Sequence, residues 1–178
     1  MTTDTGKPDA PLNVLLSGIV GSTAYGLDTE DSDVERRPAV AWLCDLDGTL
    51  ALKGDRSPYD WSRVGEDTPN KPVITVARAL AARSSLIFMS GRMEQCREQT
   101  RMWLHTFACE PALCMCKFPL LMRKDGDMRP DQVVKRELYE RVKGLHEIEG
   151  ALDDRDRVVK MWREELGLTC LQVAPGNF

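Results

Sequence analysis

Short apolar runs alternate with longer segments of helical periodicity over residues 40–173. The runs predict buried strands at 40–45, 86–89, 119–122, 148–152 and 168–173, with a further extended stretch at 112–116. Helical spacing predicts helices at 71–83, 93–107, 131–143 and 155–166. Strands that alternate with helices indicate crossover connections. We therefore expect an α/β, Rossmann-like fold: a mainly parallel sheet with helices on both faces and a small cap within the turn-rich residues 49–69.

A change in composition divides the chain near Pro38. The first segment ends in the polar stretch GLDTEDSDVERR, and a strongly apolar strand follows the proline. Proline disfavours a helix before it and cannot pair in the middle of a sheet. We expect two parts: residues 1–37 and a main domain over residues 38–178.

Composition and charge are those of a soluble protein. Of the 178 residues, 42% are hydrophobic and 29% are charged, and no apolar run approaches the roughly 20 residues of a membrane-spanning helix. The N-terminus is polar and lacks an apolar signal core, so we expect a cytoplasmic protein without membrane association. The net charge is −4, but residues 1–35 hold seven acids and one base, or −6, which leaves +2 for the remainder. That balance is compatible with a phosphate-rich substrate.

The six cysteines show no paired CxxC spacing. Cys44 and Cys170 lie in apolar strand runs, where a free cysteine behaves as a small hydrophobic residue. The other four could form a zinc site, but their spacing fits no common zinc pattern: Cys96, Cys109, Cys114 and Cys116. We expect reduced thiols.

Polar groups follow three of the predicted strands. They are Asp45 and Asp47 after the first strand, Ser90, Gly91 and Arg92 after LIFM, and Asp153 and Asp154 after IEGAL. Ligands of parallel sheets bind at the carboxyl ends of the strands, so we expect these groups at one edge of the sheet.

Two carboxylates two residues apart in DLDGT can both face one cleft if Gly48 allows the chain to bend. Asp45 can attack phosphorus to form an acyl phosphate, and Asp47 can protonate the leaving oxygen and then deprotonate water. Clustered carboxylates beside a phosphate carry excess negative charge, which a bound Mg²⁺ ion would offset. Asp153 and Asp154 would supply the remaining ligands of that ion. A turn or helix cap is the non-functional interpretation of such a DxD pair.

Three further side chains can hold a phosphate. Ser90 and the backbone at its turn can bind phosphate oxygens, and Arg92 offers a planar fork. Lys135, within the predicted helix 131–143, can neutralise the phosphate and the nucleophile. The alternatives are that Ser90 only caps a helix and that Lys135 is a solvated surface residue.

These segments resemble a known family. DLDGT, MSGR, the helical Lys135 and ALDDR resemble, in order, the four motifs of the haloacid-dehalogenase-like phosphatases, over about residues 39–174. The resemblance implies Asp45 as nucleophile, Asp47 as general acid/base, and phosphate binding by Ser90 and Lys135. It also implies Mg²⁺ at Asp45, Asp47, Asp153 and Asp154, and a phosphoaspartyl intermediate.

A narrower resemblance bears on the substrate. DLDGTLAL, RSPYDW, LLMRKDGDMRPDQVVK and LDDRDRVVKMWRE are similar to the 3′-phosphatase domain of bacteriophage-type polynucleotide kinase/phosphatase. That similarity implies a phosphate contact by Arg56 and functional roles for Arg92 and Asp131, with Gly91 and Thr49 beside the substrate. The kinase motif GxxxxGK[ST] does not occur in these 178 residues, so we expect no 5′-kinase activity. Tyr59 and Trp61 could stack on a terminal base, or could simply pack the loop.

Residues 13–35 resemble the start of a polymerase-beta-like nucleotidyltransferase. Gly21 and Ser22 would touch a nucleotide, and Asp33 and Glu35 would bind metal. There is no room for the rest of that fold before residue 38, so we interpret the segment as a truncated relic or fusion joint.

The leading hypothesis is an Mg²⁺-dependent polynucleotide 3′-phosphatase that acts on the 3′ ends of DNA or RNA. A phosphatase of a small phosphorylated metabolite is one alternative, and a non-catalytic module that binds nucleic-acid ends is another. A short insert after Thr49 favours an open cleft that admits a polymer end.

Overall fold

Five strands form the central sheet, in the order β5-β4-β1-β6-β7. The computed structural model describes residues 39–57 and 59–177, so the expectations for residues 1–37 lie outside it. The strands are β1 (Ala39–Cys44), β4 (Ser85–Met93), β5 (Leu120–Arg123), β6 (His146–Arg155) and β7 (Cys170–Gly176). The pairs β1–β4, β4–β5 and β6–β7 are parallel, with Leu43 opposite Ile87 and Ala151 opposite Cys170.

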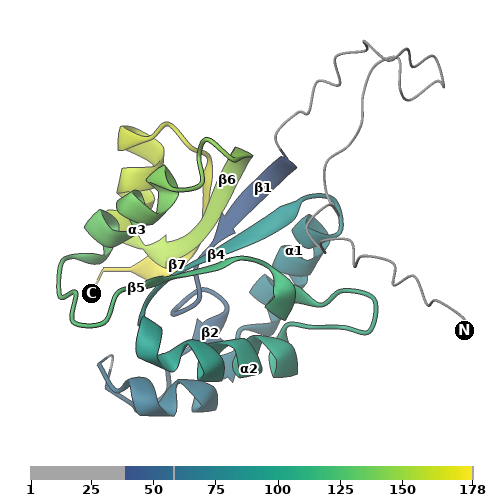
Figure 1. The fold of residues 1–178 in the computed structure, drawn as a ribbon, viewed down its shortest axis with the longest axis vertical. Helices are drawn as coiled ribbons and strands as arrows, with labels where there is room; N and C mark the ends of the chain where they lie inside the picture. Colours follow the sequence, from purple (N-terminus) through teal and green to yellow (C-terminus); the bar gives the residue numbers. More distant parts are fainter. Residues whose placement is uncertain (1–38, 58, 178) are drawn as a thin grey trace, which may run out of the picture. The chain divides into compact units, whose positions relative to one another are not determined.

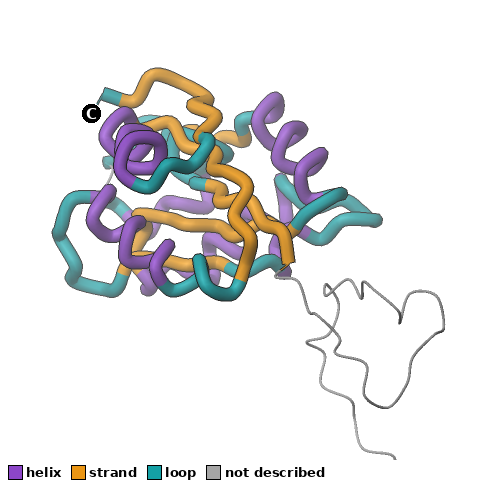
Figure 2. The backbone as a smooth tube through the Cα atoms, turned by 90° about the horizontal axis from the view of Figure 1, so that it is seen from above, coloured by secondary structure: helices purple, strands orange, loops and turns teal. Residues whose placement is uncertain are grey.

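Helices connect the strands and cover both faces of the sheet (Figures 1 and 2). They are α1 (Lys71–Ala81), α2 (Arg97–Phe107), α3 (Asp131–Glu140) and α4 (Asp156–Lys160), and α4 continues as a π-helical turn, Met161–Glu165. Short 3₁₀ helices lie at Trp61–Glu66, Glu94–Cys96 and Met115–Lys117. Among the described residues, no helix has the length and apolarity needed to cross a membrane.

Alternation along the strands divides the core into two layers. Leu86 and Phe88 of β4 face α1 and α2 and pack with buried Ile74, Trp103 and Leu104. Ile87 and Met89 face the other way and pack against residues of α3 and α4. Because successive side chains of a strand point to opposite faces, one apolar run supplies both layers. The expected α/β fold is confirmed.

The small cap is the insert after β1. It contains the antiparallel pair β2 (Ala51–Leu52) and β3 (Thr68–Pro69), joined through the 3₁₀ helix Trp61–Glu66. Asp60 caps that helix by accepting a hydrogen bond from the Ser62 N–H. This short pairing was not evident from the sequence, since two-residue strands leave no periodic signal.

Two expected elements differ from the structure. The predicted helix 93–107 begins only with the 3₁₀ turn at Glu94, because β4 runs on to Met93. The expected extended stretch 112–116 is wrong: a bridged turn between Glu110 and Leu113 leads into the 3₁₀ helix Met115–Lys117.

Candidate active site

The carboxyl ends of β1, β4, β5 and β6 meet at one edge of the sheet. The register is irregular between Ser90 and Met93 on β4 and between Asp153 and Arg155 on β6. Such irregularities re-aim side chains, and both lie where candidate site residues leave the sheet. The Asp45 N–H still donates to the Leu152 carbonyl (2.9 Å), which holds the first acid beside β6.

Asp45 lies in a buried group of acids around one lysine. The Lys135 ammonium is 2.8 Å from Asp45 Oδ1 and 2.7 Å from Asp153 Oδ2. Lys135 comes from α3 and is only 1% exposed, so it is not a solvated surface residue. Asp153 Oδ2 also accepts a hydrogen bond from the Trp162 indole N–H (3.3 Å), and this contact fixes the acid behind the lysine.

Asp154, on the cavity wall, and the buried Thr49 complete this group. The Thr49 hydroxyl lies 3.3 Å from Asp45 Oδ2 and 3.4 Å from Asp154 Oδ1. Gly48 has a φ of +88°, and a Cβ there would lie 2.1 Å from Asp154 Oδ2. The bend in DLDGT therefore requires glycine both for its backbone conformation and for the approach of Asp154.

Burial and mutual repulsion raise the pKa of two of these acids. Burial is the main cause of the raised pKa of Asp45, with Lys135 opposing it and Asp153 adding to it. The pKa of Asp154 is raised to about 6, chiefly by burial and then by Asp153. Burial lowers the pKa of Lys135, but the surrounding carboxylates outweigh burial and the pKa is raised. The lysine is a permanent cation, and the acids need more positive charge than it supplies.

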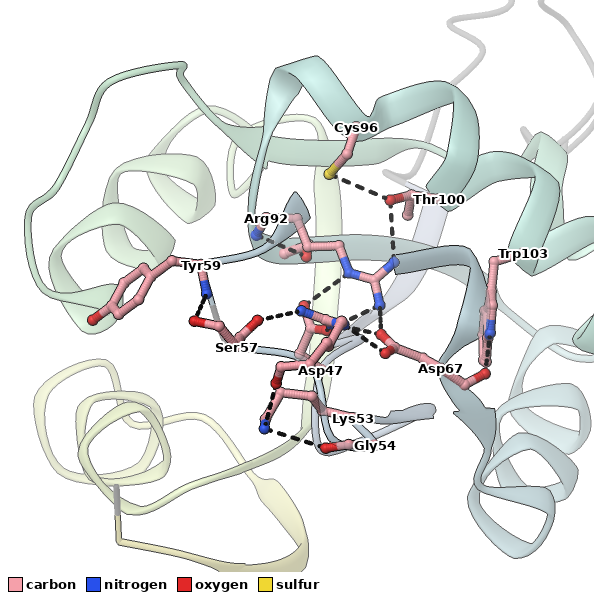
Figure 3. Close-up of polar contacts among 12 residues, drawn as sticks. Asp47, Lys53, Gly54, Ser57, Tyr59, Asp67, Arg92, Cys96, Thr100 and Trp103 are labelled. Carbon is pink, nitrogen blue, oxygen red and sulfur yellow. Dashed lines mark hydrogen bonds and ion pairs between the residues drawn. The ribbon is translucent and has the colours of Figure 1, made fainter. Parts of the chain in front are cut away.

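Asp47 lies in a second group, with Asp67 and two arginines (Figure 3). Its Oδ1 accepts hydrogen bonds from Arg56 and Arg92, each at 2.9 Å, and its Oδ2 accepts one from Arg92 Nε at 2.9 Å. Asp67 bridges the same guanidiniums, with contacts of 2.6 Å to Arg56 and 2.8 Å to Arg92.

Further contacts fix this second group in place. Thr100 accepts from Arg92 Nη1 (3.2 Å), and the Trp103 indole donates to the Asp67 carbonyl (2.7 Å). The Arg92 N–H donates to the Ser90 hydroxyl oxygen (3.1 Å). Asp67 is a buried site residue that sequence reasoning missed, because a single acid in a turn-rich insert carries no local signal.

The sequence predicts that the guanidiniums of Arg56 and Arg92 bind the phosphate directly, and the structure places them differently. In this structure both guanidiniums are occupied by carboxylates, and Arg92 is fully buried. Arg56 lies on the wall of the cavity, whereas Arg92 is not among the residues that line it. The side chain of Asp47 also lies on the arginines and is not among the acids that cluster as potential metal ligands.

Asp131 and Gly91 form a third part of the site, held by Arg123. The Arg123 guanidinium donates to the Gly91 carbonyl (2.8 Å) and to Asp131 Oδ1 (3.1 Å). A Cβ on Gly91 would lie 2.5 Å from Asp131 Oδ1, so this approach requires glycine. Burial is the largest single influence on the pKa of Asp131 and raises it. The positive charges of Lys135, Arg155 and Arg123 together outweigh burial, so the pKa is lowered. Sequence reasoning missed Arg123, although it follows the apolar run of β5 as the other site residues follow their strands.

These groups surround a cavity of about 710 Å³. Asp45, Asp47 and Asp154 lie on its wall together with Gly91 and Asp131. Basic residues contribute much of the rest: Lys53, Arg56, Arg123, Arg129, Arg155 and Arg157. Tyr59, 72% exposed, stands at the rim, and its ring points away from the arginine–carboxylate group in Figure 3.

The donor set fits a hard divalent cation. Asp45, Asp153 and Asp154 each offer a carboxylate oxygen, and these oxygens lie within 4.8 Å of one another. Oxygen-only donors favour Mg²⁺, Ca²⁺ or Mn²⁺ over softer metals. Asp45 and Asp154 face the cavity, while Asp153 is held behind them by Lys135 and Trp162.

Comparisons with known proteins agree with this site. The family described as "Polynucleotide kinase PNKP phosphatase domain" matches residues 39–178. Chains in two structures, the Pnkp1/Rnl/Hen1 complex and the Pnkp1/Rnl/Hen1 RNA repair complex, each have 37% identity and a TM-score of 0.72. Each match covers 85% of this chain, with 51% of the first matched chain and 49% of the second. A "Putative bifunctional polynucleotide kinase/RNA ligase" of Autographa californica nuclear polyhedrosis virus is 36% identical over 128 residues, which are 70% of this chain and 18% of the viral protein.

A more distant structure shares the fold. The class C acid phosphatase from Bacillus anthracis with tungstate bound has a TM-score of 0.55 and 17% identity, over 87% of this chain and 71% of that one. The present chain spans about half of the Pnkp1/Rnl/Hen1 chain and under a fifth of the viral protein. With a site of this geometry and a family match over residues 39–178, the chain belongs to the polynucleotide kinase phosphatase domains of haloacid-dehalogenase-like fold and is a phosphatase.

Proposed function

We propose that this phosphatase removes 3′-phosphates from RNA or DNA ends during nucleic-acid repair, with Mg²⁺ and through a phosphoaspartyl intermediate on Asp45. The observation that carries the proposal is the placement of Asp45 on the cavity wall with Lys135 behind it and Asp154 beside it. The carboxylate is fixed by neighbours and open to a phosphate from one side. That is the geometry a nucleophile needs for attack in line with a leaving oxygen.

In the first step, an Asp45 oxygen bonds to phosphorus as the bond from phosphorus to the 3′-oxygen breaks. The departing oxygen takes a proton from Asp47 and leaves as a 3′-hydroxyl. Lys135, 2.8 Å from Asp45, favours the ionised form of that carboxyl against the effect of burial and would stabilise the charge that develops on the phosphoryl oxygens. The backbone at Gly91, on the cavity wall, would orient those oxygens, and the buried Thr49 would act through its contacts with Asp45 and Asp154.

In the second step, Asp47 accepts a proton from water as the water oxygen attacks the phosphorus of the acyl phosphate. The bond from phosphorus to Asp45 then breaks, and inorganic phosphate leaves. Both Asp47 oxygens accept hydrogen bonds from guanidiniums in this structure. Asp47 therefore has to give up at least one of these contacts before an oxygen can carry a proton or accept one. Arg56, on the cavity wall, is the partner we expect to turn toward the substrate phosphate.

Asp45 and Asp154 would hold the Mg²⁺ ion, with Asp153 as a supporting acid. When bound, the ion offsets the negative charge of the carboxylates and the phosphate. The cluster has three carboxylates and one ammonium, a formal charge of −2. Burial, and then the neighbouring Asp153, raise the pKa of Asp154 to about 6.

The shape and charge of the cavity support a polynucleotide end as the substrate. Six basic residues line the wall, and Tyr59 at the rim offers an exposed ring on which a base could stack. The relatives are described as an RNA repair complex and a polynucleotide kinase/RNA ligase, which favours RNA ends. Since GxxxxGK[ST] does not occur in these 178 residues, we infer that this chain contributes phosphatase but not 5′-kinase activity.

The test is a direct assay of the purified protein. Release of phosphate is measured on matched 3′-phosphate RNA, 3′-phosphate DNA, 5′-phosphate RNA and a panel of sugar phosphates, each with and without Mg²⁺. We expect turnover of the 3′-phosphate oligonucleotides to exceed that of the others. Faster turnover of a sugar phosphate would overturn the proposed substrate, and undiminished turnover without divalent metal would overturn the proposed cofactor.

A further inference from the structure

Four soft ligands lie together at the other end of β5, outside the residues that line the cavity. This His–Cys cluster consists of His105, Cys109, Cys114 and Cys116, and one donor atom from each lies within 4.8 Å of all the others. Sequence reasoning considered Cys96 as the fourth member. The structure places Cys96 elsewhere, where its thiol donates to the Met93 carbonyl (3.1 Å), and brings His105 to the group instead.

Two of three donor distances in the cluster match those of a tetrahedral metal site. Zn–S bonds of about 2.3 Å and a Zn–N bond of about 2.0 Å place tetrahedral sulfurs about 3.8 Å apart, and sulfur and nitrogen about 3.5 Å apart. In the structure, Cys109 Sγ and Cys114 Sγ are 3.8 Å apart, and Cys116 Sγ and His105 Nδ1 are 3.6 Å apart. Cys114 Sγ and Cys116 Sγ are closer, at 3.2 Å.

The local fold explains how the ligands converge. His105 and Cys109 are one helical turn apart at the end of α2. The chain then reverses in a tight turn in which Glu110 and Leu113 exchange two backbone hydrogen bonds of 2.9 and 3.0 Å. The residues that flank this turn, Cys109 and Cys114, are thereby brought side by side. The 3₁₀ helix that follows adds Cys116.

Hydrogen-bond donors and cations lie beside the cluster. The Cys116 N–H donates to Cys109 Sγ (3.2 Å), a contact that stabilises negative charge on sulfur. Arg78 donates to the Cys109 carbonyl (3.3 Å), and Arg101 donates to the Cys116 carbonyl. Three thiolates and a dication carry a net charge of −1, which Arg101 helps to balance, while Arg78 is also paired with Glu110 (2.7 Å).

We propose that the His–Cys cluster binds one structural Zn²⁺ ion. Three cysteines and one histidine form a closed tetrahedral set with no position left for water, as in structural rather than catalytic zinc sites. The ion would link the end of α2 to the segment that leads into β5. The other end of β5 carries Arg123, which holds Gly91 and Asp131 in the active site. Zinc would thus stabilise the strand on which that arginine is mounted.

The first test measures metal in the wild-type protein. The protein is expressed in medium containing zinc, purified without chelator under reducing conditions, and analysed by mass spectrometry of the elements. We expect one zinc ion per chain. Replacement of zinc by Co²⁺ should give thiolate-to-cobalt charge-transfer bands and strong visible bands, which a carboxylate site cannot produce.

Matched variants assign the ion to the cluster. Cys114→Ser and His105→Ala should lose most of the bound zinc and the charge-transfer bands. Cys170→Ala, which changes a cysteine elsewhere, and His146→Ala, which changes the second of the two histidines, should keep both. Circular dichroism checks that each variant is folded.

Three results would overturn the proposal. One is wild-type protein that neither contains zinc nor gives thiolate bands with Co²⁺. Another is zinc that persists unchanged in the folded Cys114→Ser and His105→Ala variants. The third is a disulfide between two of the three cysteines in freshly purified protein, detected by mass spectrometry. The wild-type measurement does not depend on any variant and is independent of phosphatase activity.

Discussion

Two groups of charged side chains lie next to each other in the active site, and they differ in charge. The potential metal ligands Asp45, Asp153 and Asp154 share one cation, Lys135, a formal charge of −2. A fourth acid, Asp131, lies 3.5 Å from Lys135 but is also paired with Arg123. In the neighbouring group, Asp47 and Asp67 face Arg56 and Arg92, and the charges cancel. Both groups are largely buried, so water screens the interactions between their charges only weakly.

The difference indicates what each group is for. Buried charges are tolerated when they are paired and hydrogen-bonded, and the second group satisfies that condition within the protein. It therefore fixes Asp47, and the proposed turn of Arg56 toward a phosphate would break the ion pair between Arg56 and Asp47. The first group is unsatisfied until a cation and a substrate arrive, which is the condition expected where chemistry occurs. Substitutions in the two groups should consequently have different effects.

The largest effect should come from Asp45→Asn in the unsatisfied group. It removes the proposed nucleophile and some of the excess negative charge, so activity should fall by on the order of 10³-fold or more while the fold stays intact. Phosphate release from a 3′-phosphate oligonucleotide measures activity, and thermal unfolding measures stability. Substantial residual turnover would exclude Asp45 as the nucleophile.

Removal of divalent metal should be nearly as severe. Treatment with EDTA should abolish turnover, because the −2 group then repels the substrate phosphate, and added Mg²⁺ should restore it. Zn²⁺ added in place of Mg²⁺ is the control for recovery at the His–Cys cluster and should restore little activity. Activity that survives EDTA would contradict the role of the acid group as a metal site.

The strand-end rule explains why most of the unsatisfied group could be predicted from sequence. Asp45, Asp153 and Asp154 each follow an apolar strand, and parallel strands end at a common edge. The same rule applied to LLMR would have included Arg123. The rule does not apply to Lys135, because the burial of a lysine on a helix depends on how the helix packs.

The balanced group and the His–Cys cluster could not be predicted in the same way. Asp67 lies in an irregular insert, and its partner Arg92 is 25 residues away in sequence. Cys96 precedes the first turn of α2 and His105 lies in its last turn, so which of them joins the other cysteines depends on how the helix packs. In both cases the decisive contacts join separate segments of the chain, which periodicity does not reveal.

Asp67→Asn should mainly reduce stability. It leaves two buried guanidiniums sharing Asp47, and breaking a buried pair costs about 3 kcal/mol in the free energy of unfolding. Asp55→Asn is the matched control, since Asp55 lies in the same insert but pairs with Arg63 on the surface. We expect a change of less than about 0.5 kcal/mol there, measured by urea unfolding. Equal losses in the two variants would mean that the balanced group is not a unit of stability.

Arg56→Ala should separate substrates. We expect turnover of a 3′-phosphate oligonucleotide to fall about tenfold more than turnover of a small generic phosphate ester, a difference of about 1.4 kcal/mol in transition-state binding. Arg63→Ala, at an exposed arginine of the same insert, should change neither. Equal losses on the two substrates would argue that Arg56 only positions Asp47 and does not contact the polynucleotide.

The smallest effect should be a pH dependence of metal binding at the unsatisfied group. In the metal-free protein the pKa of Asp154 is raised to about 6, mainly by burial, so the carboxyl takes up a proton as the pH falls through that value. Metal binds the ionised form, and the apparent affinity should therefore drop about fourfold between pH 7 and pH 5.5 from this residue alone. Mn²⁺ is a suitable probe, because it prefers oxygen ligands and its binding can be followed by electron paramagnetic resonance.

The Asp154→Asn variant should bind Mn²⁺ weakly at both pH values and should lose the fourfold change in affinity between them. An affinity that is constant over this range in the wild type would show that Asp154 is already ionised, and that the excess charge of the group is borne by other acids.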